Sequence, residues 1–325
     1  MAVPATYSYQ TGNANRRTVI KEDVSDVIHN ISPSETPMLS AAKTKTARGA
    51  VHEWLEDTLA SPGANAVAEG ADAAITDMGT GTRLVNSTQI SSKAYGVSGT
   101  FEAIDSYGFS SAIAYAGAKA ARVLKNDVDY AISGGGTQTR TITASGVATK
   151  TGDIDTYVTQ GTFGATTGAA GDGLGTTAAT AGDATTFSQA LLDQAIEECW
   201  EAGGKPSLLV TNANNRKIFS SFDGVGTAGA SGVTRSDRSS KTIWGVADVY
   251  MSNFGELNVV ASRHLRANAS IWLIDPEYLA VAYLRPWQES DLAKTGDSLN
   301  RQMVVEYALE VSNRSAHSGI HDCTN

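Results

Sequence analysis

The chain has 325 residues, of which 41% are apolar and 18% charged, a balance typical of a globular protein rather than a disordered one. Its net charge of −9 argues against a general affinity for nucleic acid or for an anionic membrane. Two cysteines, Cys199 and Cys323, are too few for a disulfide scaffold, and no stretch approaches the roughly 18 apolar residues of a membrane span. The first residues lack the apolar run of a signal peptide, so we expect a soluble protein made in a cytoplasm.

The N-terminal part predicts an extended arm followed by a projecting hairpin. Residues 1 to about 22 are polar and show neither helical nor strand period. Two strand-like runs at 50–57 and 83–100 flank a small, flexible and acidic stretch. Neither run has a fully apolar face, so we expect a hairpin that leaves the body and is stabilised by a neighbouring subunit.

The longest predicted helix covers residues 110–133. Ser110 or Ser111 can cap its N-terminus, and the glycines at 134–136 stop it. Its apolar stripe at helical spacing consists mainly of small side chains: Ile113, Ala116, Gly117, Ala120, Val123, Leu124 and Val128. This helix can therefore lie close to another backbone.

The rest of the chain predicts a mixture of helices and strands. Residues 136–185 are rich in Thr, Gly and Ala, which predicts surface hairpins or loop. An amphipathic helix capped by Thr186 follows, and a further helix capped by Asn212 comes after a short buried strand. Later strands are expected at 246–251, 256–261, 270–274 and 279–284, then a polar link and a last strand that alternates cleanly at 302–313. This order indicates an α+β fold.

One pair of motifs resembles the site of penicillin-recognising serine enzymes. Ser40 and Lys43 have Ser-x-x-Lys spacing, and 294–296 is a Lys-Thr-Gly box. The middle Ser-x-Asn element is absent, the nearest stretch being 236–238, and Lys294 lies in the polar link. Short patterns of this kind occur by chance, so a serine hydrolase is only a remote alternative and we expect no enzyme activity.

The other candidate sites are weaker. His317, His321, Asp322 and Cys323 are zinc-ligand types, but the paired spacings of zinc sites are missing, and a polar, mobile C-terminus is favoured. The aspartate pairs at 127/129 and 153/155 are expected to be solvated surface residues. No catalytic, cofactor-binding or metal site is therefore assigned.

Several collinear segments carry a resemblance to a known family. "LRPWQESDLAKTGDSLNRQMVVEYALEVSN" (284–313) resembles a C-terminal signature of tailed-phage major capsid proteins. Further similar positions are "DVSDVIHNISPSETPMLSAA", "HEWLEDTLA", "AEG" at 68–70, "NSTQISSKAYGVSGT" and the Asp275-Pro276 pair. Together they cover most of residues 23–318, and the Thr/Gly-rich stretch is the weakest part.

The resemblance implies the Hong Kong 97-type capsid fold, which encapsulins also use. The implied division is an N-terminal arm at 1–48, an extended β-hairpin loop at 49–100, a peripheral domain with a long spine helix at 101–136, an axial domain with the Thr/Gly-rich insertion at 137–278, and a return to the peripheral domain at 279–325. By the same resemblance, Ser40, Lys43 and Lys294 are structural positions. No local motif assigns a covalent crosslink to any lysine.

The implied function is self-assembly, as pentamers and hexamers, into the icosahedral head of a tailed double-stranded DNA phage. The head would form in the bacterial host cytoplasm and enclose DNA without specific recognition, with no membrane involved. Portal, scaffold and decoration proteins are candidate partners. An encapsulin-like cellular shell is the alternative with the same fold.

Charge patterning adds a hypothesis about assembly. Residues 51–80 contain acids but no Lys or Arg: Glu53, Glu56, Asp57, Glu69, Asp72 and Asp77. Basic residues gather in the arm and in the long helix: Arg16, Arg17, Lys21, Lys43, Lys45, Arg48, Lys119, Arg122 and Lys125. We expect the acidic hairpin to lie over the basic arm or helix of an adjacent subunit.

Overall fold

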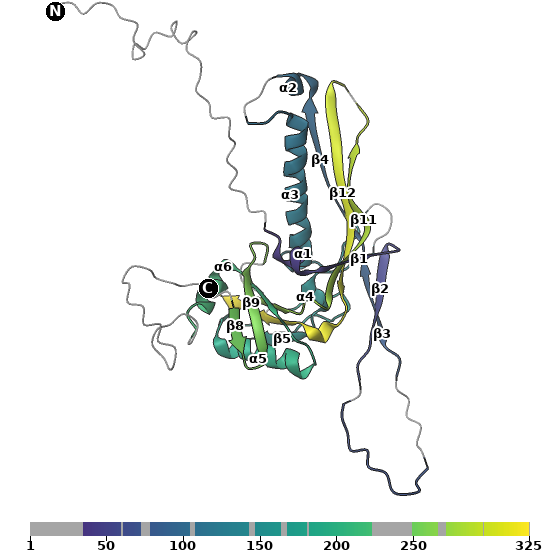
Figure 1. Cartoon of the computed structure of the whole chain (residues 1–325), viewed down its shortest axis with the longest axis vertical. Coiled ribbons are helices and arrows are strands. Elements are labelled where there is room, and N and C mark those ends of the chain that lie inside the picture. The colour runs from purple at the N-terminus through teal and green to yellow at the C-terminus, as the bar shows by residue number, and fades with distance from the viewer. Residues whose placement is uncertain are drawn as a thin grey trace, which may run out of the picture.

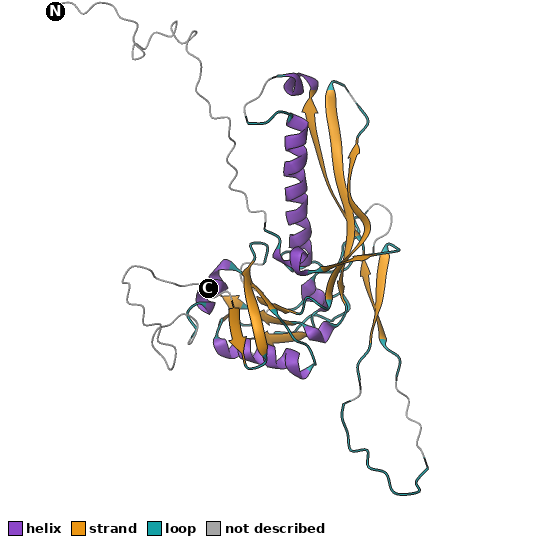
Figure 2. Cartoon of the chain, viewed as in Figure 1, coloured by secondary structure: helices purple, strands orange, loops and turns teal. Residues whose placement is uncertain are grey.

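A computed structural model describes residues 35–324 except 60, 73–78, 105–107, 143–146, 164–167, 181, 223–248, 266–270 and 295. Two sheets dominate it, a four-stranded sheet in the order β1-β11-β12-β4 and a six-stranded sheet in the order β5-β13-β10-β7-β9-β8 (Figures 1 and 2). Two small pairs, β2-β3 and β14-β6, complete the described strands. This mixed architecture confirms the predicted α+β class.

The elements have the following bounds. The strands are β1 Lys43–Thr46, β2 Val51–Glu56, β3 Thr82–Ser87, β4 Gln89–Ser98, β5 Gln160–Phe163, β6 Thr185–Thr186, β7 Leu208–Thr211, β8 Val249–Ser252, β9 Gly255–Ala261, β10 Ile271–Ile274, β11 Leu279–Asp291, β12 Ser298–Val311, β13 Ser318–His321 and β14 Cys323–Thr324. The helices are α1 Pro37–Ala41, α2 Gly99–Ala103, α3 Ala112–Ile132, α4 Ile154–Tyr157, α5 Gln189–Glu201 and α6 Ala213–Phe219, with a short 3-10 helix, η2, at Arg314–Ala316. Within the described ranges, none of the helices combines the length and apolar character that a bilayer crossing requires.

The long helix α3 forms as its sequence predicts. The Ser111 hydroxyl accepts a hydrogen bond from the backbone N–H of Ala114 (3.3 Å), and Gly134 follows the last turn with φ +78°. The helix lies along β4 and β12 (Figure 1). A Cβ on Gly117 would lie 2.9 Å from the Tyr95 hydroxyl, so the missing side chain allows the close approach that the small-residue stripe predicted.

Strands β11 and β12 extend much further than predicted. The stretch expected to be a polar link pairs up to Asp291 opposite Arg301, and only 292–297 connects the strands. Arg301 forms ion pairs across the two strands with Glu289 (3.1 Å) and Asp291 (2.8 Å). Cross-strand charge pairs can stabilise strands that bury little apolar surface. The extension of β11 and β12 therefore has no hydrophobic alternation from which it could be predicted.

The predicted strand at 83–100 is divided between two sheets. Its first part, β3, pairs with β2, whereas its second part, β4, pairs with β12. Thr88 lies at the switch: its N–H donates to the Ala50 carbonyl (2.8 Å) and its hydroxyl donates to Glu306 (2.9 Å). The projecting hairpin is therefore β2-β3 with the loop 57–81, and β4 belongs to the body.

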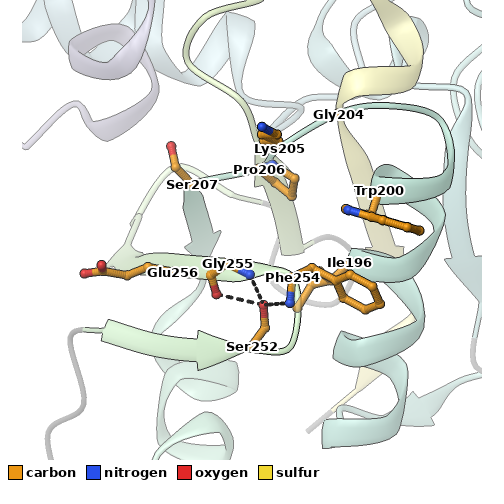
Figure 3. A pocket seen from close by; sticks show the side chains of 10 residues that line it. All are labelled: Ile196, Trp200, Gly204, Lys205, Pro206, Ser207, Ser252, Phe254, Gly255 and Glu256. Atoms are coloured by element: carbon orange, nitrogen blue, oxygen red, sulfur yellow. Dashed lines mark hydrogen bonds between the residues drawn. The ribbon is translucent and has the colours of Figure 1, made fainter.

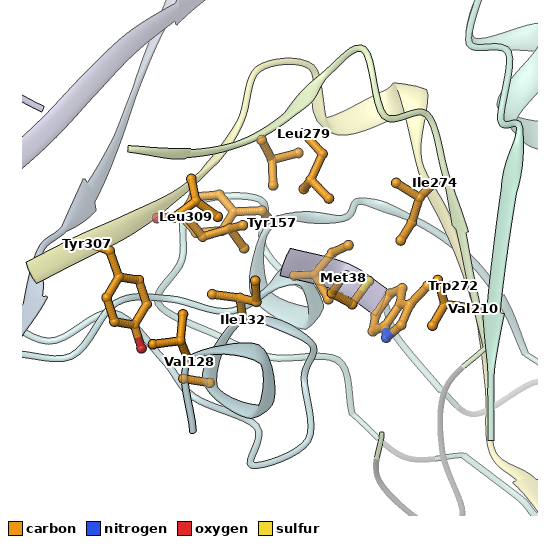
Figure 4. Packing of buried hydrophobic residues seen from close by; sticks show 14 of the residues in the cluster. Met38, Val128, Ile132, Tyr157, Val210, Trp272, Ile274, Leu279, Tyr307 and Leu309 are labelled. Carbon is orange, nitrogen blue, oxygen red and sulfur yellow. The ribbon is translucent and has the colours of Figure 1, made fainter. Parts of the chain in front are cut away.

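One hydrophobic core joins the two main sheets (Figure 4). Met38 of α1, Ile132 of α3 and Tyr157 of α4 pack in it with Trp272 of β10 and Leu309 of β12. The Trp272 indole N–H also donates to the Ser133 carbonyl at the end of α3 (3.1 Å). A second core lies under α5 and is shared by the six-stranded sheet and α6.

The N-cap of α6 is the predicted residue, whereas the N-cap of α5 lies two residues after the predicted one. Asn212 caps α6 as predicted, since its side chain accepts from the Asn215 N–H (2.8 Å). The cap of α5 is Ser188 rather than Thr186, because the Ser188 hydroxyl accepts from the Leu191 N–H (3.4 Å) and Thr186 belongs to β6.

Part of the Thr/Gly-rich insertion is buried, contrary to the prediction of a surface loop. Residues 151–158, which include α4, are all buried. The Gly152 N–H donates to the Asn86 side-chain oxygen (2.8 Å), and the Leu309 N–H donates to the Thr151 hydroxyl (3.1 Å). These bonds satisfy the polar backbone that burial would otherwise leave unpaired.

Asp153, expected to be solvated, lies inside this segment and accepts a hydrogen bond from the Gln138 N–H. Burial raises the pKa of Asp153 to about 8. The Asp153 carboxyl therefore stays protonated in the native state up to about pH 8, whereas in the unfolded chain it ionises near pH 4. Between about pH 4 and pH 8, this group should make the protein less stable as pH rises, by up to about 1.4 kcal/mol per pH unit.

We predict that Asp153→Asn removes this slope and raises the free energy of unfolding near pH 8. Urea unfolding between pH 5 and pH 8 measures it. Asp183→Asn, which neutralises an exposed aspartate, is the control and should keep the wild-type slope. Equal pH slopes in wild type and Asp153→Asn would contradict the prediction.

Candidate functional site

The β2-β3 hairpin has two unlike faces at its root. Strand β2 alternates, so that His52, Trp54 and Glu56 are less exposed than Val51, Glu53 and Leu55 on the other face. The inner face meets the body of the same chain, whereas Leu55 is 73% exposed. The root is therefore anchored within its own subunit, and the outer face is open.

Glu310 of β12 binds both the arm and the hairpin. Its carboxylate lies 2.6 Å from the Lys45 ammonium of β1 and 2.8 Å from the His52 Nε2 of β2. Burial alone would raise the pKa of Glu310, but hydrogen bonds from His52, Lys45 and Ser312 hold that pKa at about 2. Lys45 is thus already paired within its own subunit and is a poor candidate for steering an adjacent one.

Glu56 ends β2 and forms a second ion pair with the body. One carboxylate oxygen accepts from the Arg314 backbone N–H (2.8 Å) and the other from its Nε (2.7 Å). Both side chains are largely buried, at 6% and 21% exposure. The prediction that Glu56 faces a neighbouring subunit is therefore wrong.

Uncharged contacts complete the root. The Trp54 ring packs on Tyr157, whose hydroxyl donates to the Val85 carbonyl (2.7 Å). The Asn86 side chain is fully buried and donates to the Leu309 carbonyl (2.7 Å). Hairpin, insertion and β12 are thus joined by groups far apart in the sequence.

Beyond the root, the loop is exposed and acidic. Residues 57–81 carry no strand or helix in their described part, and Leu59 and Val67 are 96% and 76% exposed. Asp57, Glu69 and Asp72 are also exposed there, while Asp77 lies outside the described residues. A loop that is exposed along its described length buries little surface within its own subunit, so it is available for contact with another one.

The outer face of α3 is basic. Lys119, Arg122 and Lys125 are exposed, and the half-exposed Tyr115 and Val123 lie beside them. Figure 1 shows that the hairpin loop and the free end of α3 point to opposite ends of the subunit. The acidic loop therefore cannot reach this helix of its own chain. In the arm, Arg16, Arg17 and Lys21 lie outside the described residues, whereas Arg48 is exposed.

The serine-hydrolase motifs do not come together. Ser40 is exposed on α1, and Lys43 pairs with Ala280 near the start of β11. Lys294 is exposed beyond Asp291, the last residue of that strand. About eleven strand residues at roughly 3.3 Å each place the two motifs some 35 Å apart. The stretch 236–238 and Thr295 lie outside the described residues.

The C-terminal His and Cys residues are structural instead of mobile. His317 is fully buried, and its Nδ1 accepts from the Asp275 N–H (3.2 Å). Burial lowers the pKa of His317 to about 4 and raises that of Cys323 to about 12. In β13, His321 packs edge-on against Trp272. Among the described residues, no three His, Cys, Asp or Glu side chains converge as ligands for a metal ion.

The remaining aspartates also differ from expectation. Asp129 and Asp155 are buried, and only Asp127 of those in the two pairs is exposed. Asp129 lies 2.8 Å from His264 Nδ1 and accepts from the Leu39 N–H (2.8 Å). Burial raises the pKa of Asp129, which these partners partly offset. Asp129 thus joins α3 to α1 and to the residues around His264, and neither it nor Asp155 is solvated.

A shallow pocket lies between α5 and the β8-β9 turn (Figure 3). Its volume of about 180 Å³ is below the roughly 300–1,000 Å³ of typical ligand pockets. Trp200 and Phe254 lie against each other in it, with ring centroids 5.2 Å apart and ring planes tilted by 36°. The Ser252 hydroxyl accepts from the Phe254 and Gly255 N–H groups and donates to the Gly255 carbonyl (2.8 Å), so it is used in the turn.

A family match covers nearly the whole chain. The family described as SU10 major capsid protein matches residues 5–324. Curated proteins yield no sequence match.

Solved structures match over nearly the whole chain. A chain of the cyanophage A-1(L) capsid asymmetric unit is 15% identical with a TM-score of 0.64, covering 95% of this chain and 98% of that one. A chain from Gordonia phage Cozz is 12% identical with a TM-score of 0.62, covering 100% and 99%. One from Mycobacterium phage Adephagia is 14% identical with a TM-score of 0.62, covering 97% and 98%. These likenesses place the chain in the Hong Kong 97-type fold.

We predict that Ser40→Ala and Lys294→Ala leave ester and β-lactam hydrolysis at the background rate, because the two side chains are too far apart to act on one substrate. Mass spectrometry after treatment with a fluorophosphonate or a penicillin checks for acylation. Labelling of Ser40 that disappears in Ser40→Ala would contradict this.

Proposed function

The chain belongs to the SU10 major capsid protein family, and from this membership we propose how its surfaces build a shell. It is a major capsid protein of a tailed phage, a structural component of the icosahedral head and not an enzyme. The match over residues 5–324 is the observation that carries this conclusion. It favours a phage head over the encapsulin-like cellular shell.

We propose the following parts for the described chain. The four-stranded sheet with α3 is the peripheral domain, the β2-β3 hairpin with its loop is the extended loop, and residues 35–48 end the arm. The six-stranded sheet with α5 and α6 is the axial domain. Because β13 pairs with β10 and β5, residues 318–324 go with the axial domain, which moves that boundary from the one expected.

The acidic loop is proposed to cover the basic face of α3 on an adjacent copy. Asp57 stands beside the open face of the hairpin, and Glu53 on that face forms only an exposed ion pair with Arg83 of β3 (3.3 Å). Lys119 and Arg122 form no ion pair with another described residue. Each exposed pair contributes only about 0–1 kcal/mol, but a shell repeats the contact many times. Because the loop projects away from α3 of its own subunit (Figure 1), these charges favour pairing between copies over closure within one.

Further partners follow from the role of a head protein. We propose assembly in the bacterial host cytoplasm around double-stranded DNA that is not recognised by sequence, with portal, scaffold and decoration proteins as partners. A matched structure from phage G is described as major capsid proteins with decoration proteins, at 12% identity and a TM-score of 0.54. The net charge of −9 limits tight binding of packaged DNA to the wall.

We predict that deleting residues 61–80 leaves a folded subunit that fails to close shells. The deletion leaves a five-residue connection between β2 and β3, a length that hairpins tolerate, and spares every root contact. Circular dichroism should match the full chain, while negative-stain microscopy should show few closed particles. Closed particles of normal size and heat resistance would refute the role of the loop.

We also predict that Glu53→Gln with Asp57→Asn lowers the assembly rate at low salt by about tenfold, because electrostatic steering of association is lost. About 1 M salt should slow the wild type to a similar rate by shortening the Debye length to roughly 3 Å. Light scattering across a salt series measures both effects.

The reciprocal variant Lys119→Gln with Arg122→Gln should slow assembly similarly. The control Asp183→Asn with Glu201→Gln makes the same charge change on exposed acids of the six-stranded lobe and should assemble normally. A wild-type rate and salt slope in both test variants would refute the electrostatic contact and leave the capsid assignment standing.

A further inference from the structure

The hairpin leaves the body at one charged residue. Glu56 is the last paired residue of β2, opposite Thr82, and the described chain beyond it is no longer paired as strands. A side chain at this position fixes the point from which the loop projects. Contacts nearer the body, such as those of Asn86, hold the start of the ribbon but act further from the loop.

The partner of Glu56 lies where the two sheets meet. Arg314 belongs to η2, the short turn between β12 of the four-stranded sheet and β13 of the six-stranded sheet. Its backbone is held in place because the Ser315 N–H donates to the Asn313 side chain (3.0 Å). The bidentate contact therefore ties the hairpin to the junction of both sheets, and not to one flexible element.

A glycine makes room for the arginine side chain. Gly173 has φ +69°, and a Cβ there would lie 2.8 Å from both Cδ and Nη1 of Arg314. Gly173 also donates its N–H to the Thr156 carbonyl (3.0 Å), so this loop is fixed against α4. The Arg314 side chain thus lies against the Gly173 backbone, with its Nε directed toward Glu56.

From this geometry we propose that Arg314 is a positioning residue: through Glu56 it sets the direction in which the hairpin projects before subunits assemble. The inference rests on the proposed role of the loop as a contact to a second copy. Arg314 contacts Glu56 at two points: its Nε donates to one carboxylate oxygen and its backbone N–H donates to the other. Two bonds fix the angle between the end of the ribbon and the body, which a single hydrogen bond cannot do. A two-stranded ribbon is only marginally stable by itself, so its direction depends on such contacts.

Distances between spin labels on unassembled subunits test this directly. Labels at Thr58→Cys on the hairpin and Ser290→Cys on β11 use exposed positions, and both native cysteines are buried. We expect a narrow distance distribution in the otherwise unchanged chain. In Arg314→Ala and in Glu56→Gln it should broaden by about twofold, because the charged contact nearest the loop is then lost and only contacts nearer the body hold the ribbon.

Two further variants separate direction from stability. Gly173→Ala keeps both charges but displaces the Arg314 side chain, so it should broaden the distribution even if Arg314→Ala does not fold. Leu257→Ala lowers stability in the second core, far from the hairpin, and should leave the distribution narrow. Arg314→Lys retains the charge and the backbone N–H but has no donor at the position of Nε, and should restore the width only in part.

Each result is decisive. Unchanged distributions in Glu56→Gln and Gly173→Ala, or equal broadening in Leu257→Ala, would overturn the positioning role. Broadened distributions with particles of mixed size under the microscope would support both the clamp and the loop contact. Broadened distributions with normal particles would support the clamp and overturn the proposed loop contact.

Discussion

A two-stranded ribbon buries too little apolar surface to hold a direction of its own, and the hairpin of this subunit depends on polar contacts along one face. Glu310 receives Lys45 and His52, and Glu56 receives Arg314. These groups come from the arm, the ribbon, the C-terminal end of β12 and η2, so the native direction of the hairpin requires both sheets. Removing the Arg314 side chain would leave the buried Glu56 carboxylate without its charged partner, and breaking comparable buried pairs costs about 3–5 kcal/mol.

The same junction explains why the insertion is not a surface decoration. Its residues 151–158 contact the ribbon through two hydrogen bonds: the Gly152 N–H donates to the Asn86 side chain, and the Tyr157 hydroxyl donates to the Val85 carbonyl. Small residues suit this place because neighbouring backbones come close: a Cβ on Gly171 would lie 2.4 Å from the Asp155 carbonyl oxygen. The composition that predicts loops in isolation here permits close packing around a buried turn.

Features that depend on residues close together in the chain could be predicted from the sequence. The caps at Ser111 and Asn212 depend on neighbours in the chain, and they were predictable. The last predicted strand, β12, forms where it was expected, but both of its faces are buried from Val305 to Val311, which its alternating sequence does not indicate. The extension of β11 and β12 depends on pairing between Arg301 and Asp291, which hydrophobic periodicity does not register. The burial of the C-terminal strands likewise depends on β10 and β5, which are distant in sequence.

The candidate site was predictable in outline for a related reason. An acidic segment between strands is visible in composition, but whether one acid is free or paired depends on a partner more than 250 residues away, as it does for Glu56 and Arg314. The net charge of the sequence therefore does not describe the charge of the surface. Four of the acids are buried and form hydrogen bonds or ion pairs inside the subunit: Glu56, Asp129, Asp153 and Glu310. Exposed carboxylates nevertheless lie on the hairpin loop, at Asp57, Glu69 and Asp72, and exposed cations lie on α3, at Lys119, Arg122 and Lys125. Figure 1 shows these two elements apart within the subunit, so contacts between them fit association of one copy with the next better than closure within one copy.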